Sequence, residues 1–339
     1  MISYRTRQSL RRFFTGLVIT AVILAVVGMV WLLWLNRYVI YTRDGAKLDF
    51  SLDLQFPAGE VAQRPTETGG VDIYYNEGSD AVLPETTELQ QLTGYMITAE
   101  MLQGNIPALS KQLQKLPSGT PILLDVKNIR GDFFYNTNLG PGSSKVDAAA
   151  LVTMITTLNS KGYYLIARLP AFRDYWYGRE NVNDGLFNLD RYSLWLDPDR
   201  CYWLNPTSEG TMTYLVQIIS QLRSLGFDEV VFYDFQFPDT NKIYFKEDKA
   251  EAIREAAKTL VRTCSTDTFA VSFVSSDPSF PLPQGRSRLY FSGVSAADAA
   301  SLVSQSGLAD PDVRIVFLTD LMDTRFDDYG VLRPFHPET

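Results

Sequence analysis

Gly226-Phe227-Asp228-Glu229-Val230-Val231-Phe232-Tyr233-Asp234-Phe235-Gln236-Phe237-Pro238-Asp239 is the stretch that decides the fold. Residues 229–232 are short, largely apolar and β-branched, as expected for a strand that is covered on both faces. A helical pattern over residues 211–225 precedes the strand, and Gly226 is expected to end that helix. Asp234 follows the strand, and Pro238 prevents further pairing soon after it. The stretch therefore predicts a helix, a buried strand and a carboxylate at the carboxyl end of that strand.

Strands and helices alternate along the chain from Leu92 onward. The predicted strands are Gly94–Thr98, Ile122–Val126, Tyr163–Leu169, Glu229–Phe232, Phe269–Val274, Leu289–Phe291 and Arg314–Leu318. The predicted helices are Ile106–Leu116, Asp147–Asn159, Thr211–Leu225, Asp248–Thr263 and Ala296–Ser306. This alternation requires parallel strands joined by crossover helices.

The fold class that this pattern favours is α/β, as a TIM-type (β/α)8 barrel, regular or irregular. Seven strands are visible, and an eighth would close the barrel. The candidate places for it are the long region Asp174–Asn205 and the short segment Val71–Tyr75. A doubly wound open sheet is the second choice, because no glycine-rich phosphate-binding fingerprint follows the first strand.

Asp234 has two interpretations at this stage. Chemistry in α/β barrels takes place at the carboxyl ends of the strands, which makes an acid at that position a candidate site residue. The alternative is a loop aspartate that caps the next turn. The position of the residue alone does not separate the two.

Composition and charge exclude several classes of function. The net charge is −8, and because residues 1–40 contain five arginines and no acid, the remainder carries −13. An acidic body argues against a nucleic-acid partner. The single histidine, His336, lies near the end of the chain, which disfavours catalysis by a serine or cysteine with a histidine base. No metal-ligand spacing is present, and Cys201 and Cys264 are expected to be unpaired, buried thiols.

The N-terminal region predicts one membrane anchor. Phe13–Leu35 contains no charged residue, and its length as a helix, roughly 35 Å, exceeds a hydrocarbon core of about 30 Å. Arginines crowd the N-terminal side of this segment, which places the N-terminus in the cytoplasm and the body outside it. A cleaved signal peptide is disfavoured, because the apolar run is long and lacks a small-residue cleavage site.

Polar groups follow several of the predicted strands. Asp125 lies within an apolar strand and requires a partner, which Lys127 or Arg168 could supply. Structural ion pairing and site chemistry are both consistent with this arrangement. A barrel brings the strand ends together, so Asp125 and Asp234 could form the pair of carboxyl groups that glycoside hydrolysis needs.

Four segments together resemble the putative glycosyl hydrolase domain family of bacterial envelope proteins, over roughly residues 90–240. They are Gly94–Ala99, Leu124–Asn128 with Gly131 and Tyr135, Ala167–Asp174, and Trp195–Tyr214 leading into Gly226–Glu229. The resemblance implies a TIM-type barrel that acts on an envelope or extracellular polysaccharide, without a metal or organic cofactor.

The site implied by the resemblance has an acidic pair and a sugar cleft. The acids are Asp234 and Asp125. The substrate-binding residues are expected to be Arg168, Lys127, Trp195, Trp203, Tyr233 and Gln236. Within this set, Arg168 and Lys127 are expected to set the ionisation of the acids, and the aromatic residues to line the cleft.

The fourth strand departs from the family pattern. The family usually ends this strand in Phe-Asp-Tyr-Ile-Arg-Phe-Pro, whereas this chain has Phe232-Tyr233-Asp234-Phe235-Gln236-Phe237-Pro238. Tyr233 therefore stands at the aspartate position and Gln236 at the arginine position. These differences favour an alternative, a catalytically degenerate barrel that binds glycan or a partner protein. A structural component of an envelope assembly is a third interpretation.

The sequence thus predicts four parts. Residues 1–12 are a basic cytoplasmic N-terminus and residues 13–35 a transmembrane helix. Residues 36–90 are a juxtamembrane segment and linker, and residues 91–339 are the barrel.

Overall fold

The structure is a computed structural model, which describes residues 39–42, 45–48 and 89–336. The chain forms two compact units, Met1–Glu77 and Gly78–Thr339. In the first unit, strands β1 (Val39–Thr42) and β2 (Gly45–Leu48) pair antiparallel. The predicted anchor Phe13–Leu35 and the candidate strand Val71–Tyr75 lie outside the described residues. Within the described part of the chain, no helix has the length and apolar character needed to cross a membrane.

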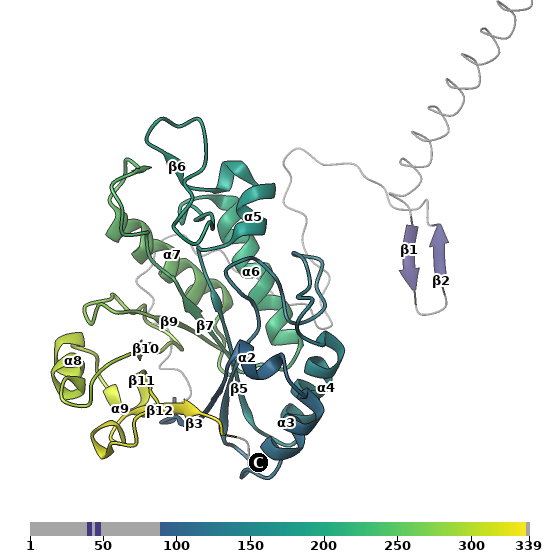
Figure 1. Cartoon of the computed structure of the whole chain (residues 1–339), viewed down its shortest axis with the longest axis vertical. Helices are drawn as coiled ribbons and strands as arrows, with labels where there is room; N and C mark the ends of the chain where they lie inside the picture. The colour runs from purple at the N-terminus through teal and green to yellow at the C-terminus, as the bar shows by residue number, and fades with distance from the viewer. Residues whose placement is uncertain (1–38, 43–44, 49–88, 337–339) are drawn as a thin grey trace, which may run out of the picture. The chain divides into compact units, whose positions relative to one another are not determined.

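The second unit contains a closed barrel of parallel strands (Figure 1). Its strands, in spatial and chain order, are β3 (Thr93–Ile97), β4 (Pro121–Asp125), β5 (Tyr164–Pro170), β7 (Glu229–Tyr233), β9 (Ala270–Val274), β10 (Leu289–Ser292), β11 (Ile315–Leu318) and β12 (Gly330–Pro334). β12 pairs with β3 and closes the ring. The predicted TIM-type barrel is confirmed, and the open-sheet alternative is wrong.

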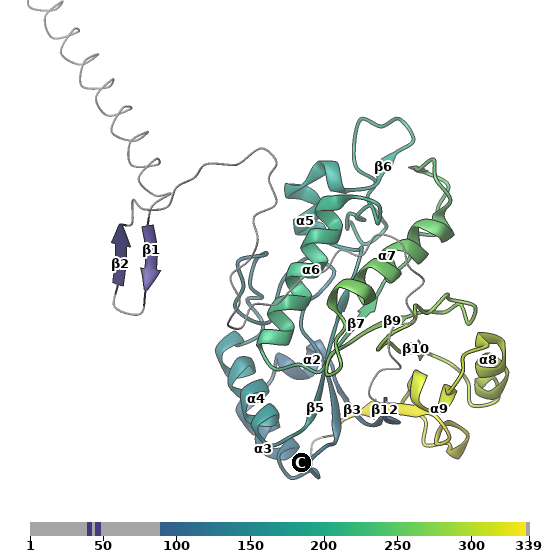
Figure 2. The ribbon, with the colours of Figure 1, turned by 180° about the vertical axis from the view of Figure 1, so that it is seen from behind.

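Helices occupy most of the crossovers between the strands. They are α2 (Ala99–Leu102), α3 (Ile106–Leu113), α4 (Ala148–Ser160), α5 (Tyr175–Glu180), α6 (Glu209–Ser224), α7 (Lys249–Cys264), α8 (Ala299–Ser306) and α9 (Pro311–Arg314). Figures 1 and 2 show the longer helices α4, α6 and α7 outside β5, β7 and β9, and the short α8 and α9 beside β10–β12. Gly226 follows α6 with a φ of 96°, as predicted for a helix-ending glycine.

The eighth strand is not where the sequence placed it. Strand β12, Gly330–Pro334, supplies the last position, and neither predicted location does. The segment was missed because it is short and contains an arginine and a proline. Pro334 is tolerated because it is the last residue of the strand, beyond the last residue of β12 that pairs with β11.

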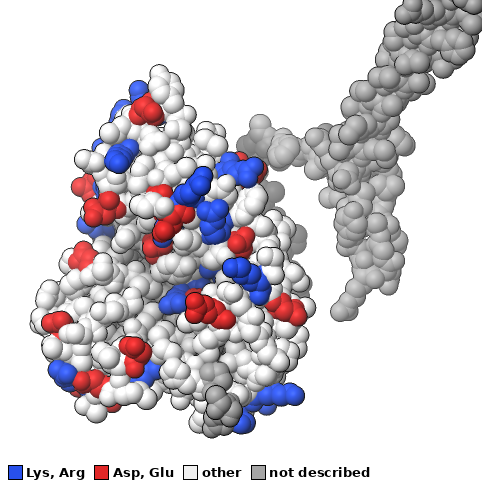
Figure 3. All heavy atoms as spheres, viewed as in Figure 1, with Lys and Arg blue, Asp and Glu red and all other residues white. Residues whose placement is uncertain are grey.

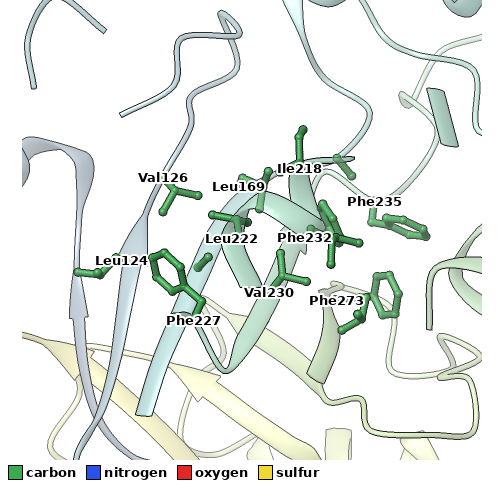
Figure 4. Packing of buried hydrophobic residues seen from close by; sticks show 14 of the residues in the cluster. Leu124, Val126, Leu169, Ile218, Leu222, Phe227, Val230, Phe232, Phe235 and Phe273 are labelled. Atoms are coloured by element: carbon green, nitrogen blue, oxygen red, sulfur yellow. The ribbon is translucent and has the colours of Figure 1, made fainter. Parts of the chain in front are cut away.

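The barrel strands are apolar on both faces. Val231 packs inside the barrel with Leu123, Ile166 and other interior residues. Val230 and Phe232 point outward into the larger core beneath the helices, as Figure 4 shows. Burial on both faces explains the continuous apolar runs that identified the strands.

Polar residues fill the barrel interior at the end where the strands begin. Glu229 pairs with Arg288 at 2.5 Å, and both side chains are almost completely buried. The hydroxyls of Tyr164 and Tyr290 also donate to the Glu229 carboxylate, each at 2.9 Å. Glu229 and Arg288 thus neutralise each other and both tyrosines bind the carboxylate, which favours a structural role for this network over a catalytic one.

The segment 174–205 covers the carboxyl end of β5 and is called the cap. It contains α5, the short helix Val182–Asp184 and strand β6 (Phe187–Asn188), which pairs with β8 (Ile243–Tyr244). Backbone N–H groups of the cap reach the end of β5, for example Leu204 to the Phe172 carbonyl at 2.6 Å. The cap therefore extends the barrel mouth, the rim formed by the carboxyl ends of the strands.

Candidate active site

Asp125 and Arg168 form a fixed ion pair at the barrel mouth. They lie opposite each other on neighbouring strands β4 and β5. Arg168 donates from Nε to Asp125 Oδ1 at 2.7 Å and from Nη2 to Oδ2 at 3.0 Å. The Ala99 N–H donates to the same Oδ2 at 2.9 Å. Of the two partners that the sequence allowed for Asp125, the structure pairs it with Arg168.

The position of this pair follows from strand periodicity. Leu123 and Ile166 lie in the barrel interior, and side chains two residues apart on a strand share a face. Asp125 and Arg168 therefore sit on the interior face, at the open end. The pair is part-buried, with 12% of the Asp125 side chain and 22% of the Arg168 side chain exposed.

Tyr233 shares this face, because it follows the interior residue Val231 by two positions. The Arg168 guanidinium carbon lies 5.9 Å from the centre of the Tyr233 ring. Burial raises the pKa of the Tyr233 phenol, and the negative charges of Asp125 and Asp234 raise it further. The phenol is therefore a neutral hydrogen-bond donor that lies near both carboxylates.

Asp234 lies at the point where β7 ends and the backbone turns. Its φ is 51°, in the left-handed region that aspartate and asparagine tolerate better than most residues. The side chain is 24% exposed, and its Oδ2 lies 4.0 Å from Arg173 Nη1. Burial raises the pKa of the Asp234 carboxyl; Arg173 lowers it and Asp197 raises it, and the net shift is upward.

The capping interpretation of Asp234 finds no support in the described residues, where its carboxylate accepts no backbone hydrogen bond. A part-buried carboxyl group with a raised pKa and only one distant cation is instead typical of a proton donor.

Arg173 organises the wall beside Asp234. Its Nε donates to Asp197 Oδ2 at 2.5 Å, and its Nη2 pairs with Asp199. Trp203 donates its indole N–H to the same Asp197 oxygen at 3.1 Å. Burial raises the pKa of Asp197, but the hydrogen bonds from the Cys201 N–H, Arg173 and Trp203 outweigh it and lower the pKa overall. Asp197 is therefore a fixed negative charge.

Trp203 is only 6% exposed and packs beneath Arg173, whose guanidinium carbon lies 5.9 Å from the indole ring. The structure thus places Trp203 in the wall of the mouth, and its ring has little surface available to a sugar. The sequence pointed to this tryptophan but assigned no role to Arg173 or Asp197. Both residues lie outside the strands and helices, where the sequence has no periodic pattern that could predict their positions.

Lys127 lies two residues beyond the end of β4, where its backbone bridges to Phe133. Its Nζ pairs with Asp174 Oδ2 at 2.6 Å, and both side chains are fully buried. The Tyr214 hydroxyl donates to the same oxygen at 2.9 Å. Asp174 also caps α5 by accepting from the Tyr177 N–H. The structure thus joins Lys127 to the base of the cap and does not bring it to Asp125.

Among the described residues, neither Trp195 nor Gln236 forms a hydrogen bond or ion pair with Asp125 or Asp234. Trp195 is half-buried and lines a pocket of about 610 Å³ on the cap. Gln236 is exposed in the loop after β7. Of the predicted residues, the structure therefore gathers Asp125, Arg168, Tyr233 and Asp234.

The mouth carries charges of both signs. Figure 3 shows basic and acidic side chains interleaved across the face of the molecule that Figure 1 presents.

No group of three metal-ligating side chains occurs among the residues that the structure describes. Cys201 and Cys264 are both buried and free, as expected.

Comparison with protein families identifies the central part of the barrel. Residues 114–273 match the family described as "Putative glycosyl hydrolase domain". The match covers slightly less than half of the chain and runs from the end of α3 to β9, so it includes Asp125, Arg168 and Asp234. The predicted resemblance is confirmed. Comparison with curated protein sequences returns no match.

Several solved structures resemble the chain at low sequence identity. A hypothetical protein from Ruminiclostridium thermocellum is 19% identical, covering 53% of this chain and 96% of its own, with a TM-score of 0.46. The glycoside hydrolase domain of PelA from Pseudomonas aeruginosa is 12% identical, covering 72% and 94%, with a TM-score of 0.45. An exo-β-N-acetylglucosaminidase from Vibrio harveyi is 9% identical, covering 68% and 41%, with a TM-score of 0.47.

Proposed function

We propose that this chain is a glycoside hydrolase of the barrel type that acts on an envelope or extracellular polysaccharide. The observation that carries the proposal is Asp234, a part-buried carboxyl group with a raised pKa at the carboxyl end of a barrel strand. The family match over residues 114–273 supports the same class of reaction. The site requires only carboxyl groups and water for this chemistry.

The two carboxyl groups differ in their surroundings, as acid–base chemistry requires. Asp234 is the proton donor to the leaving glycosidic oxygen. Asp125 already accepts hydrogen bonds at both oxygens. This favours a role in stabilising positive charge on the sugar, or in ordering the attacking water, over direct attack. Tyr233, between them, donates a hydrogen bond to substrate.

A second function, glycan binding without cleavage, rests on a specific observation. Tyr233 and Gln236 stand where the resembled family usually carries an aspartate and an arginine. Tyr233 occupies the interior face beside Asp125, and the acid is displaced by one residue to Asp234. A barrel with this change could retain its glycan site and lose turnover.

One experiment separates the two functions. The full chain, purified in detergent, is incubated with a set of soluble polysaccharides. Release of new reducing ends and retardation of the chain in gels containing each polysaccharide are measured in parallel. Release of reducing ends supports the hydrolase. Retardation without release supports binding alone. If no polysaccharide gives either release or retardation, both functions are contradicted.

We also propose that Phe13–Leu35 anchors the body on the extracytoplasmic side of the membrane. The charge-free apolar run and the arginines that precede it support this arrangement. We expect the full chain in a bacterial host to resist extraction from membranes by alkaline carbonate, and its body to be digested by protease added outside intact cells. A chain without residues 1–36 should stay in the soluble fraction. Protection of the body until the cells are lysed would contradict the orientation.

A further inference from the structure

The cap carries a pocket that the proposed chemistry does not use, here called the side pocket. Its volume is about 610 Å³, within the range of about 300–1,000 Å³ that is common for ligand sites. Residues from α5, β6, the segment 193–196 and the loop before β8 line it. Several segments of the cap and the loop after β7 thus converge on one cavity.

The lining combines aromatic rings with cations. Trp195 and Tyr202 are the aromatic residues, and Arg179 and Lys242 are the charged ones. None of the described residues that line the side pocket is acidic. This is unusual on a body that carries a large negative charge, because the surrounding composition would favour acids.

The two cations are available to a ligand. Arg179 lies against the Trp176 ring, with its guanidinium carbon 5.3 Å from the ring centre. Its contact with Glu180 is 3.7 Å long and exposed on both sides, so water screens it. Lys242 is exposed and forms no ion pair within the described part of the chain. Within the described residues, only the screened contact with Glu180 offsets the positive charge at the side pocket.

Further positive charge flanks the side pocket around Tyr244 of β8. Arg191 and Lys246 lie over the Tyr244 ring, at 4.8 and 5.7 Å from its centre. The residue before Tyr244 pairs with Asn188, which lines the side pocket. Asp190, which precedes Arg191, accepts a hydrogen bond from the Tyr192 N–H, which fixes its carboxylate locally.

A prearranged amide and hydroxyl complete the lining. Asn188 donates from its side-chain nitrogen to Ser193 Oγ at 2.9 Å and to the Leu194 carbonyl at 3.2 Å. These bonds fix the amide and leave its Oδ1 as an acceptor. The Ser193 hydroxyl proton remains as a donor. A fixed acceptor beside a donor suits the hydroxyl groups of a sugar.

From this arrangement we infer that the side pocket binds an anionic sugar unit, one that bears a carboxylate or a phosphate. Arg179 and Lys242 hold the negative group, the aromatic residues offer apolar surface to the ring, and Asn188 and Ser193 bind its hydroxyls. An acidic peptide would use the cations but not this combination of aromatic surface and paired donor and acceptor.

The side pocket is connected to the barrel mouth through one β-hairpin. Leu196 and Tyr202 pair across the hairpin and line the side pocket. Asp197 and Trp203, the next residues along each arm, bind each other beneath Arg173 at the mouth. A glycan held at the side pocket would lie one hairpin away from Asp234. The inference shares with the proposed function only the assumption of a glycan ligand.

The test uses the full chain and four probes: polygalacturonate, its carboxyl-reduced neutral form, poly(glycerol phosphate) and polyglutamate. Dissociation constants are measured by tryptophan fluorescence or calorimetry at low and high salt. We expect binding to one or both anionic carbohydrates, weakening at high salt, and little binding to the neutral polymer or to polyglutamate. The anionic carbohydrate that binds identifies the charged group as carboxylate or phosphate.

Variants assign the binding to the side pocket. Lys242→Gln and Arg179→Gln should each weaken binding about fivefold, as expected for loss of an exposed charge contact. Lys242→Arg should retain it, and Lys258→Gln on the exposed surface of α7 is the matched control. Trp195→Ala should weaken binding about tenfold. Because Trp195 also packs against the core, the lysine variants keep the test decisive if Trp195→Ala fails to fold.

Three results would overturn the inference: equal affinity for the neutral polymer or polyglutamate, no binding to either anionic carbohydrate, or unchanged affinity in Lys242→Gln and Arg179→Gln. Reducing ends are measured in the same samples. Charge-selective binding without cleavage would support the side pocket as a binding site and contradict the hydrolase activity. Cleavage without charge-selective binding would support the hydrolase activity and contradict binding at the side pocket.

Discussion

Replacing Lys127 with methionine lowers the free energy of unfolding by about 3–5 kcal/mol, the cost expected when one partner of a buried ion pair is removed. Lys127 Nζ and Asp174 Oδ2 are 2.6 Å apart, and neither side chain is exposed to solvent. Methionine fills a similar volume, so little of the loss comes from a cavity. The cost arises because the buried Asp174 carboxyl group loses its cation and is left with only the Tyr214 hydroxyl and the Tyr177 N–H as partners.

A double-mutant cycle isolates this interaction. Asp174→Asn retains an N-cap residue for α5 but leaves the Lys127 ammonium unpaired, so it should also be strongly destabilising. The double variant Lys127→Met/Asp174→Asn should be less destabilised than the sum of the two single variants. Unfolding by urea is followed by circular dichroism of the full chain. Lys258→Met, which removes an exposed ion pair with Glu255, is the control and should cost less than about 1 kcal/mol. A Lys127→Met variant as stable as this control would contradict the argument.

Most barrel strands were predictable because they are buried on both faces. Seven of the eight were identified from short apolar runs separated by helical patterns, with ends within about two residues of those observed. β12 lacked this signal. Gly330-Val331-Leu332-Arg333-Pro334 has only two apolar side chains in a row, and only its position between β11 and β3 makes it a strand.

The site could be predicted only where strand periodicity determines it. Asp125 and Arg168 belong to strands, so their position at the mouth followed from the strand ends, and the pairing register brings them together. Arg173 and Asp197 lie in the cap, where tertiary contacts between distant segments set the backbone path. Nothing in their local sequence indicates that Arg173 joins Asp197, Asp199 and Asp234. Lys127 illustrates the converse, because it lies beyond the end of β4, where strand periodicity no longer determines which side chains it meets.

Asp234→Asn is expected to lower kcat/KM for polysaccharide cleavage by about 10²- to 10⁴-fold, the contribution typical of a general acid. Asparagine is the appropriate replacement. It tolerates the left-handed φ of 51° and has nearly the same volume, so the fold should be unchanged, whereas alanine would be strained at this position. The control is Asp239→Asn, an exposed residue in the same loop, which should retain full activity. Equal activity in the Asp234→Asn and Asp239→Asn variants would remove Asp234 from the mechanism.

The pH dependence of kcat/KM tests the role of Asp234 more directly than the activity of the Asp234→Asn variant does. A general acid acts in its protonated form, so kcat/KM should fall as the pH rises through the pKa of Asp234. Burial raises this pKa above the usual value for aspartate, and Arg173 opposes the shift. Arg173→Gln removes the cation that lowers the pKa of Asp234. It also leaves Asp197, whose negative charge raises that pKa, without its cationic partner. Both changes raise the pKa, so the decline in kcat/KM should move to higher pH. Arg173→Lys keeps the charge and should move the decline less. A shift to lower pH in Arg173→Gln would mean that the decline belongs to another group.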